Sequence, residues 1–237
     1  MARGHGRIDL AQPSGPVREK GPPVAGLTAR APRRQLPAGM REGTVRIIGG
    51  SHRGLALAAP GAGDPAARLR PTSDRVRESL FNLLQHSAGD PVPGARVLDL
   101  FAGTGALGLE ALSRGAVQAT FVDDGAAARA LLRRNIEKMR AMGVTRVWRR
   151  DATRLGENRG APFGLVFMDP PYGRGLGARV LASAVAGGWL APAAVIVWEE
   201  NAAQTPPEGF AALECRRYGD TWLTLLRRVP EDCPDLA

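Results

Sequence analysis

The sequence is poor in cysteine and has no long apolar segment. Its 237 residues contain two cysteines, Cys215 and Cys233, which are too few for a disulfide scaffold or a zinc site. No run approaches the roughly 18 uninterrupted apolar residues of a transmembrane helix, and the amino terminus lacks the apolar core of a secretory signal. We therefore expect a protein of the reducing cytoplasm that spans no membrane and uses no metal.

The sequence also has fewer acidic residues than basic ones. Lys and Arg number 32 against 23 Asp and Glu, which gives a formal net charge of +9. Such a balance favours a polyanionic partner such as nucleic acid. An arginine-rich proteome is the alternative explanation, because Ala, Gly and Arg are plentiful throughout. Charge alone does not decide between them.

The length fits one ordinary domain with appendages, and we expect a monomer. Residues 1–43 are rich in Pro, Gly and Arg without apolar periodicity, which predicts a disordered basic tail. Residues 44–93 are predicted to form a small RNA-contacting hairpin and helix. Residues 94–229 then form the main domain, and 230–237 a carboxyl-terminal tail.

Two features of the 44–93 segment are candidates for RNA contact. Short strands at 44–50 and 55–57 flank a tip that carries His52 and Arg53, which suits either phosphate binding or an ordinary polar turn. Pro71 and Thr72 then signal a helix start, followed by an apolar stripe at helical spacing. Arg70 precedes this helix, while Arg75 and Arg77 are expected off the stripe, facing RNA or solvent.

A strand at 96–100 leads into glycines spaced as G-x-G-x-x-G, Gly103, Gly105 and Gly108, and then a helix. Asp123 ends the next strand, 20 residues beyond Gly103, where a ribose-binding carboxylate is expected. Taken alone, this pattern is typical of dinucleotide binding and of NAD-dependent oxidoreductases.

Asp99 argues against a dinucleotide. It lies four residues before Gly103, where its carboxylate would repel a pyrophosphate. S-adenosylmethionine carries a cationic ammonium and a sulfonium, so acidic groups near the turn favour it. Phe101 lies in the same turn, and Asp151 and Ala152 follow the third strand. These three residues are further candidates for contact with the cofactor. Asp151 is equally compatible with an N-cap before Thr153.

The apolar run 165–168 predicts a buried parallel strand that ends at Asp169-Pro170-Pro171-Tyr172. Two prolines force the chain out of the sheet at its carboxyl edge, where open α/β sheets bind ligands. The Asp169 carboxylate and the Pro170 carbonyl are acceptors suited to the two hydrogens of an aromatic amine. Tyr172 offers a face for base stacking, and Arg174 lies in a basic loop beyond it.

The remaining sequence completes an α/β pattern. A helix near 178–186 and a strand at 194–199 come first, and Glu199 and Glu200 are expected to be surface charges at the strand end. Two further strands around Gly219-Asp220 predict a hairpin. We therefore expect a Rossmann-like, mostly parallel seven-stranded sheet that ends in an antiparallel hairpin, an arrangement used by class I S-adenosylmethionine-dependent methyltransferases.

From about Val45 to Val229 the chain resembles the RsmD family, bacterial methyltransferases that modify N2 of a guanine in 16S ribosomal RNA. The resemblance lies in these blocks: Arg46–Gly50 with His52–Gly54, Arg70–Thr72, Arg77–Asn82, Asp99–Gly108, Asp169–Tyr172 and Gly219–Thr221. The glycine turn and Asp-Pro-Pro-Tyr are shared by many amino-methyltransferases, so the earlier blocks point to this family. One departure is Gly125, where the family commonly has an acidic or polar residue.

The resemblance implies S-adenosylmethionine across the Gly103–Gly108 turn, Asp123 on the ribose and Asp151 near the adenine. It further implies that a guanine of the small ribosomal subunit flips out and stacks on Tyr172. Asp169 and the Pro170 carbonyl would then accept its N2 hydrogens. Two alternatives are an amino-methyltransferase acting on another RNA or on DNA adenine, and a non-catalytic RNA-binding assembly factor.

Overall fold

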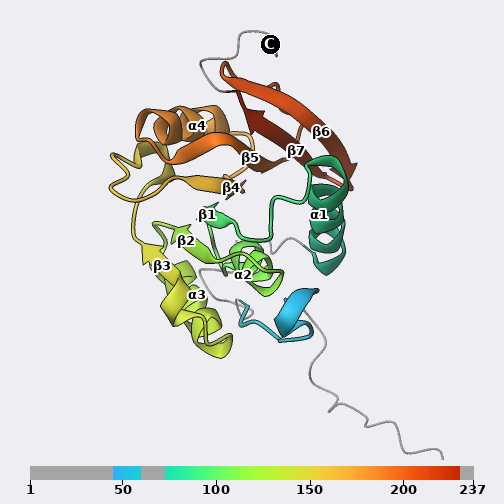
Figure 1. Ribbon diagram of the computed structural model, residues 1–237, viewed down its shortest axis with the longest axis vertical. Coiled ribbons are helices and arrows are strands. Elements are labelled where there is room, and N and C mark those ends of the chain that lie inside the picture. Colours follow the sequence, from blue (N-terminus) through green and yellow to red (C-terminus); the bar gives the residue numbers. More distant parts are fainter. Residues whose placement is uncertain (1–44, 60–72, 230–237) are drawn as a thin grey trace, which may run out of the picture. The chain divides into compact units, whose positions relative to one another are not determined.

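A seven-stranded sheet forms the centre of the computed structural model, which describes residues 45–59 and 73–229 (Figure 1). Its order is β3-β2-β1-β4-β5-β7-β6. Strands β1 to β5 are mutually parallel, and β7 is antiparallel to both β5 and β6. The prediction of a mostly parallel sheet that ends in an antiparallel hairpin is confirmed. The strands are β1 Arg96–Leu100, β2 Gln118–Val122, β3 Thr145–Trp148, β4 Phe163–Met168, β5 Leu190–Glu200, β6 Phe210–Tyr218 and β7 Thr221–Arg228.

Helices cover both faces of the sheet. The α-helices are α1 Asp74–Ser87, α2 Ala106–Ser113, α3 Ala126–Lys138 and α4 Leu176–Ala186. Short 3-10 turns are η1 Gly50–His52, η3 Met142–Val144 and η4 Ala152–Arg154. Helices α1, α2 and α3 pack on one face and α4 on the other. None of the helices within the two described ranges has the length and apolar character to cross a membrane.

Strand alternation divides the core into two layers. Val97, Leu165 and Val197 pack with α1 to α3, while the intervening Leu98 and Val166 pack with α4. Both faces of the parallel strands are therefore buried, which explains why these segments read as continuous apolar runs.

The chain order places a switch point between β1 and β4. From β1 the chain builds outward through β2 and β3, then returns to add β4 and β5 on the other side. Leu100 at the end of β1 is in register with Met168 at the end of β4. Ligands of open α/β sheets bind at the carboxyl ends of such strands, so the segments after Leu100 and Met168 define the candidate site.

The amino-terminal hairpin is less regular than predicted. Instead of two strands, one antiparallel bridge joins Arg46 and Ala56, and η1 forms the tip. Helix α1 begins at Asp74 with a Ser73 cap, whose side chain accepts from the Val76 amide. Three predicted residues lie outside the described part of the chain: Arg70 and the start signals Pro71 and Thr72. The predicted tails 1–43 and 230–237 also lie outside it.

Arg77 is a clear departure from the sequence expectation. Its side chain is fully buried and donates to the Arg46 carbonyl and to the Asp74 carboxylate. It thereby fastens the hairpin to α1. The prediction that Arg77 lies on an exposed face toward RNA or solvent is wrong, because a helix residue off the apolar stripe can still be covered by a chain segment that docks on it.

Candidate active site

Asp99 lies at the carboxyl end of β1, beneath the glycine turn. Its side chain is 3% exposed, and Oδ2 accepts the Gly108 amide at 2.9 Å. Burial raises the pKa of Asp99 to about 8; the Gly108 amide opposes this shift and the nearby Asp123 adds to it. A buried carboxyl that resists ionisation is well placed to be ionised by a cation bound beside it.

The turn after β1 has the left-handed backbone that its glycines permit. Gly103 and Gly105 have φ of 54° and 77°. A Cβ at Gly105 would lie 2.2 Å from Leu132 Cδ1, so this position also needs glycine for packing against α3. Phe101 has φ of 59°, a conformation that bulky residues rarely adopt and that is often found at functional sites.

Asp123 organises the same turn from the end of β2. Its Oδ2 accepts the Gly103 amide at 2.9 Å, and Oδ1 accepts the Gly125 amide at 2.7 Å. Burial raises the pKa of Asp123, and these two amides act in the opposite direction. Two carboxylate oxygens offer about four lone-pair sites, so both amide bonds leave capacity for a ribose hydroxyl.

Asn135 ties the glycine turn to the amino-terminal segment. This fully buried side chain donates from Nδ2 to the Thr104 carbonyl at 2.9 Å and to the Ala58 carbonyl at 3.0 Å. Its Oδ1 accepts the Ala58 amide at 2.6 Å. The backbone that follows the amino-terminal hairpin is therefore held next to the candidate cofactor turn.

Asp151 lies beyond β3 and is exposed. Its Oδ1 accepts the Thr153 amide at 2.8 Å and the Thr153 hydroxyl at 2.7 Å, so Asp151 is the N-cap of η4, as the alternative interpretation allowed. These two bonds lower the pKa of Asp151 and keep it ionised. Ala152, the first residue of η4, is buried. The contact of Asp151 with adenine stays a prediction.

Asp169 follows β4, one residue beyond Met168. Continuing the strand alternation puts its side chain on the same face as Leu165 and Phe167, which is also the face of Asp99. Burial raises the pKa of Asp169 well above its ordinary value, and the charges of Glu199, Asp99 and Glu200 raise it further. The structure thus brings Asp99 and Asp169 together at one sheet edge.

Tyr172 is anchored by Glu199 and Thr221, two residues that the sequence did not link to it. Its hydroxyl donates to Glu199 Oε1 at 3.0 Å and lies 3.4 Å from Thr221 Oγ1. Burial raises the pKa of Tyr172, as do Glu199 and Asp169, while the Thr221 hydroxyl opposes the shift. The residue is 36% exposed, so part of it stays accessible while the contacts of its hydroxyl fix its orientation.

Glu199 and Glu200 are not surface charges, and this prediction is wrong. They are 4% and 5% exposed, because β7 and the loop after β4 cover the end of β5. Glu200 Oε1 accepts the amides of Gly173 and Asn201, both at 3.1 Å. Their place at the carboxyl end of an apolar strand resembles that of Asp169, but the segments that cover them are distant in sequence.

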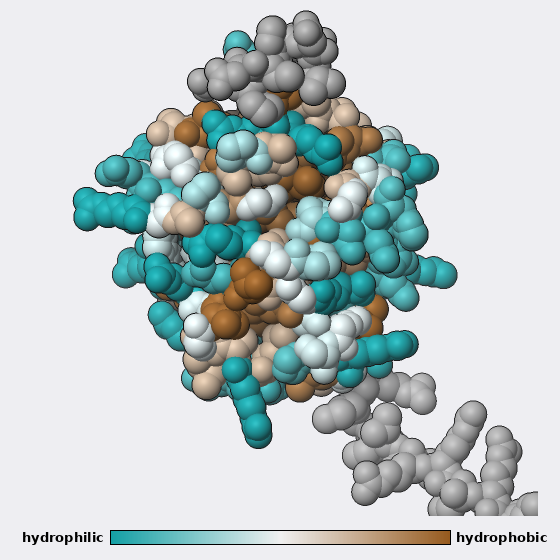
Figure 2. Space-filling model, viewed as in Figure 1, coloured by the Kyte–Doolittle hydropathy of each residue, from teal (hydrophilic) through white to brown (hydrophobic). Residues whose placement is uncertain are grey.

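The candidate RNA residues do not gather in one place. His52 and Arg53 lie at the tip that docks on Ser113, at the end of α2 farthest from the glycine turn. Arg75 is exposed in the first turn of α1, and Arg174 is exposed directly after Gly173. Figure 2 shows hydrophilic side chains projecting around the margin of one face of the molecule. Of these described residues, Arg174 belongs to the same loop as Asp169 and Tyr172.

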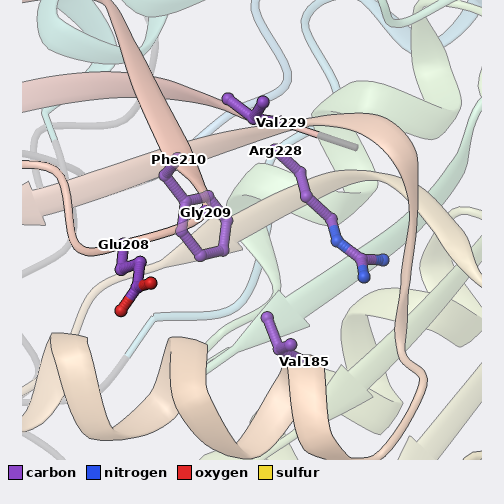
Figure 3. Close-up of a pocket in the computed structure, with 6 residues that line it drawn as sticks. All are labelled: Val185, Glu208, Gly209, Phe210, Arg228 and Val229. Atoms are coloured by element: carbon purple, nitrogen blue, oxygen red, sulfur yellow. The ribbon is translucent and has the colours of Figure 1, made fainter. Parts of the chain in front are cut away.

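Two hollows are lined by residues other than Asp99 and Asp169. One, of about 270 Å³, lies between the end of α4 and the hairpin β6–β7; Val185, Phe210 and Arg228 line it (Figure 3). Because β7 runs antiparallel to β5, this end of β7 is at the opposite sheet edge. The other, of about 600 Å³, is lined by Trp148 and by Arg150, Arg154 and Arg159.

A family model described as Conserved hypothetical protein 95 matches residues 45–227. The chain belongs to this family. A relative from Escherichia coli strain K12, called Ribosomal RNA small subunit methyltransferase D, is 42% identical over 71% of this chain and 82% of its own length. The namesake in Haemophilus influenzae is 32% identical over 75% of this chain and 91% of its own. The resemblance to the RsmD family is confirmed.

Solved structures agree with this family assignment. A structure described as putative methyltransferase yhhF from Escherichia coli matches with a TM-score of 0.67 at 38% identity, over 80% of this chain and all of that one. A putative methylase from Haemophilus influenzae matches with a TM-score of 0.63 at 28% identity, over 79% of this chain and all of that one. The Rossmann-like methyltransferase fold of this family member is therefore shown.

Proposed function

We propose that this protein transfers the methyl group of S-adenosylmethionine to N2 of a guanine in 16S ribosomal RNA of the small ribosomal subunit. The observation that carries the proposal is the pair Asp99 and Asp169 on one face, at the adjoining ends of β1 and β4. One carboxylate faces the candidate cofactor turn, and the other follows the strand that ends in Pro-Pro-Tyr. The names of the relatives supply the class of substrate.

The charges around the glycine turn fit S-adenosylmethionine and do not fit a dinucleotide. Asp99 is buried beneath the turn and Asp123 binds its Gly103 amide. A pyrophosphate would meet two carboxylates there, whereas an ammonium and a sulfonium would be attracted by them. Asp99 is suited to the cationic methionyl part, Asp123 to the ribose hydroxyls, and Asp151 to the adenine amino group.

The residues after β4 suit an exocyclic amine. Asp169 and the Pro170 carbonyl accept the two N2 hydrogens, which orients the nitrogen lone pair. Tyr172, held by Glu199, provides the surface on which the flipped guanine stacks. Well-aligned reactants can gain about 7–11 kcal/mol from orientation, so positioning accounts for much of the expected acceleration.

S-adenosylmethionine, when bound, supplies a methyl group on a cationic sulfur that leaves as a neutral thioether. As the N2–carbon bond forms, the carbon–sulfur bond breaks and its electron pair stays with sulfur. N2 then carries a surplus proton, which passes to the Asp169 carboxylate. The raised pKa of Asp169 makes its ionised form a stronger base, and a neighbouring cation favours that ionised form.

The test offers methyl-labelled S-adenosylmethionine to small subunits from a strain that lacks this protein. Naked 16S ribosomal RNA, large subunits and adenine-containing DNA are parallel substrates. We expect labelled N2-methylguanosine at one position of 16S ribosomal RNA, identified by nuclease digestion and mass spectrometry. Label on adenine in DNA or in another RNA, or no label on any substrate, would overturn the proposal.

A further inference from the structure

The base side of the candidate site contains an acid that the methyl-transfer chemistry above does not use. Met168 of β4 is in register with Trp198 of β5, and Asp169 and Glu199 are the next residues on each strand. Val195 and Val197 alternate with buried residues of the other layer, so Glu199 falls on the α1–α3 face. Asp169 and Glu199 therefore occupy equivalent positions on adjoining strands, and Asp99 lies on the same face of the third strand, two residues nearer the centre of the sheet.

This order gives each carboxylate a different neighbour. Asp99 contacts α2 and the glycine turn through the Gly108 amide, on the cofactor side. Glu199 lies on the opposite side of Asp169, where it accepts the Tyr172 hydroxyl at 3.0 Å. A base that stacks on Tyr172 and presents an amine to Asp169 therefore has Glu199 beside it, away from the methyl donor.

The structure assigns Glu199 as the residue that selects guanine: its carboxylate accepts the N1 hydrogen while Asp169 and the Pro170 carbonyl accept the N2 hydrogens. This assignment rests on the proposed function. Guanine carries donors on the adjacent atoms N1 and N2, so two neighbouring acceptors match it. Adenine and cytosine have an unprotonated ring nitrogen beside their amine, and its lone pair would face the Glu199 carboxylate.

The Glu199 carboxylate can accept hydrogen bonds from Tyr172 and from a base at the same time. A carboxylate has about four lone-pair sites, and the Tyr172 hydroxyl uses one of them. The side chain is 4% exposed, so the hydrogen bond to N1 forms away from water, where a missing partner is costly.

The experiment compares guanine with 2-aminopurine, which keeps the 2-amino group but has no N1 hydrogen. Small subunits are reconstituted from ligated 16S ribosomal RNA with either base at the position found by the labelling experiment. Methyl transfer is followed by mass spectrometry for the wild type, Glu199→Gln and Tyr172→Phe. Calorimetric titration with S-adenosylmethionine verifies that each variant folds and binds the methyl donor.

We expect the wild type to prefer guanine over 2-aminopurine by about 100-fold in kcat/KM, since a matched base contact contributes ~1–3 kcal/mol. Glu199→Gln should reduce this preference at least ~10-fold, because an amide can accept from N1–H or donate to the lone pair of 2-aminopurine. Tyr172→Phe removes the hydroxyl and keeps Glu199, so it should preserve the preference whatever its effect on rate.

An unchanged preference in Glu199→Gln would overturn the assignment. So would a loss of preference in Tyr172→Phe, which would trace selection to the tyrosine hydroxyl. If Glu199→Gln does not fold, Glu199→Asp, which withdraws the carboxylate by one methylene, must lower the preference in the same direction. A wild type that methylates no guanine N2 would instead refute the proposed function, and the assignment would fall with it.

Discussion

At the scale of single residues, Asp169 carries the sharpest prediction. Asp169→Ala removes an acceptor for the target amine and the proposed proton acceptor. Transfer to 16S ribosomal RNA should fall by about 10²–10⁴-fold, the usual contribution of such a group. Affinity for S-adenosylmethionine, measured by calorimetry, should change little because Asp99 and Asp123 remain.

A control for this variant is Glu208→Ala, which removes an exposed carboxylate at the opposite sheet edge. It should keep the activity of the wild type. Full activity in Asp169→Ala would refute the role given to Asp169, whereas a parallel loss of cofactor binding would mean that its carboxylate serves the methyl donor instead.

The raised pKa of Asp99 predicts that the free energy of unfolding depends on pH. Its pKa rises from 3.8 in the unfolded chain to about 8 in the folded protein without ligand. The folded state therefore holds the proton more tightly between these values, and the free energy of unfolding should fall as pH rises from about 4 to 8. The slope from one such group is at most about 1.4 kcal/mol per pH unit.

Urea unfolding between pH 6 and pH 9 measures this effect. Asp99→Asn cannot ionise, so its free energy of unfolding should decline less steeply than that of the wild type and should exceed it near pH 9. Asp169 and Asp123, whose pKa values are also raised, contribute to the remaining slope. Identical slopes in both proteins would contradict the buried, proton-binding state of Asp99.

The position of a residue in the site was predictable where the path of the backbone alone determines it. Asp99 and Asp169 follow apolar parallel strands, and the carboxyl ends of such strands meet at one edge. Arg77 and Glu199 were misjudged because their burial depends on segments distant in sequence. The Arg46 carbonyl covers Arg77, and the end of β5 is covered by β7 and by the loop with Tyr172.

At the scale of elements, the hairpin is held on α2 by a buried acid. Glu110 is fully buried and accepts the amides of Ile48 and Gly49 at 2.7 and 2.8 Å, and Arg114 Nε at 2.7 Å. Gly50, with φ of 75°, sits so close to α2 that a Cβ there would lie 1.8 Å from the Ser113 carbonyl oxygen. The docking of hairpin on helix therefore tolerates little change.

Glu110→Ala should lower the free energy of unfolding by about 3 kcal/mol, because it leaves buried N–H groups without an acceptor. Chemical denaturation measures the loss. Glu137→Ala, an exposed glutamate on α3, is the matched control and should change stability by less than about 0.5 kcal/mol. Equal effects from the two substitutions would contradict a structural role for the Glu110 contacts.

The elements themselves were mostly predictable, because periodicity and glycine turns are local signals. Strands β1 to β4 and the final hairpin fall where the apolar runs indicated. The amino-terminal hairpin was the exception: its tip is a 3-10 turn shaped by Ser113, whose Oγ donates to the Gly49 carbonyl at 2.6 Å and accepts the His52 amide at 2.9 Å. No local pattern encodes such a partner.

At the scale of the whole molecule, the excess of positive charge predicts salt-dependent RNA binding. Each phosphate that a basic side chain neutralises adds about 0.7–0.9 to the slope of log affinity against log salt. Replacing Arg75 and Arg174 by Ala should lower this slope by about that amount for each arginine that binds a phosphate. Filter binding of 16S ribosomal RNA at several salt concentrations gives the measurement.

The control replaces Arg133 and Arg134, two exposed arginines of α3, and removes the same charge. Its slope should stay near that of the wild type. An equal decrease in both double variants would mean that net charge, rather than a defined surface, governs binding. Arg53→Ala then tests whether the RNA footprint reaches the far end of α2.

The position of β7 has a consequence for how the protein is made. The strand lies between β5 and β6 but follows both in the chain, and its first residue, Thr221, adjoins the Tyr172 hydroxyl. During translation the glycine turn proposed to bind the methyl donor therefore emerges well before the contacts that hold Tyr172 are complete. Until the final described strand leaves the exit tunnel and inserts, β5 keeps an unpaired edge. A nascent chain is therefore prone to wrong strand pairing and aggregation at the proposed base-binding edge.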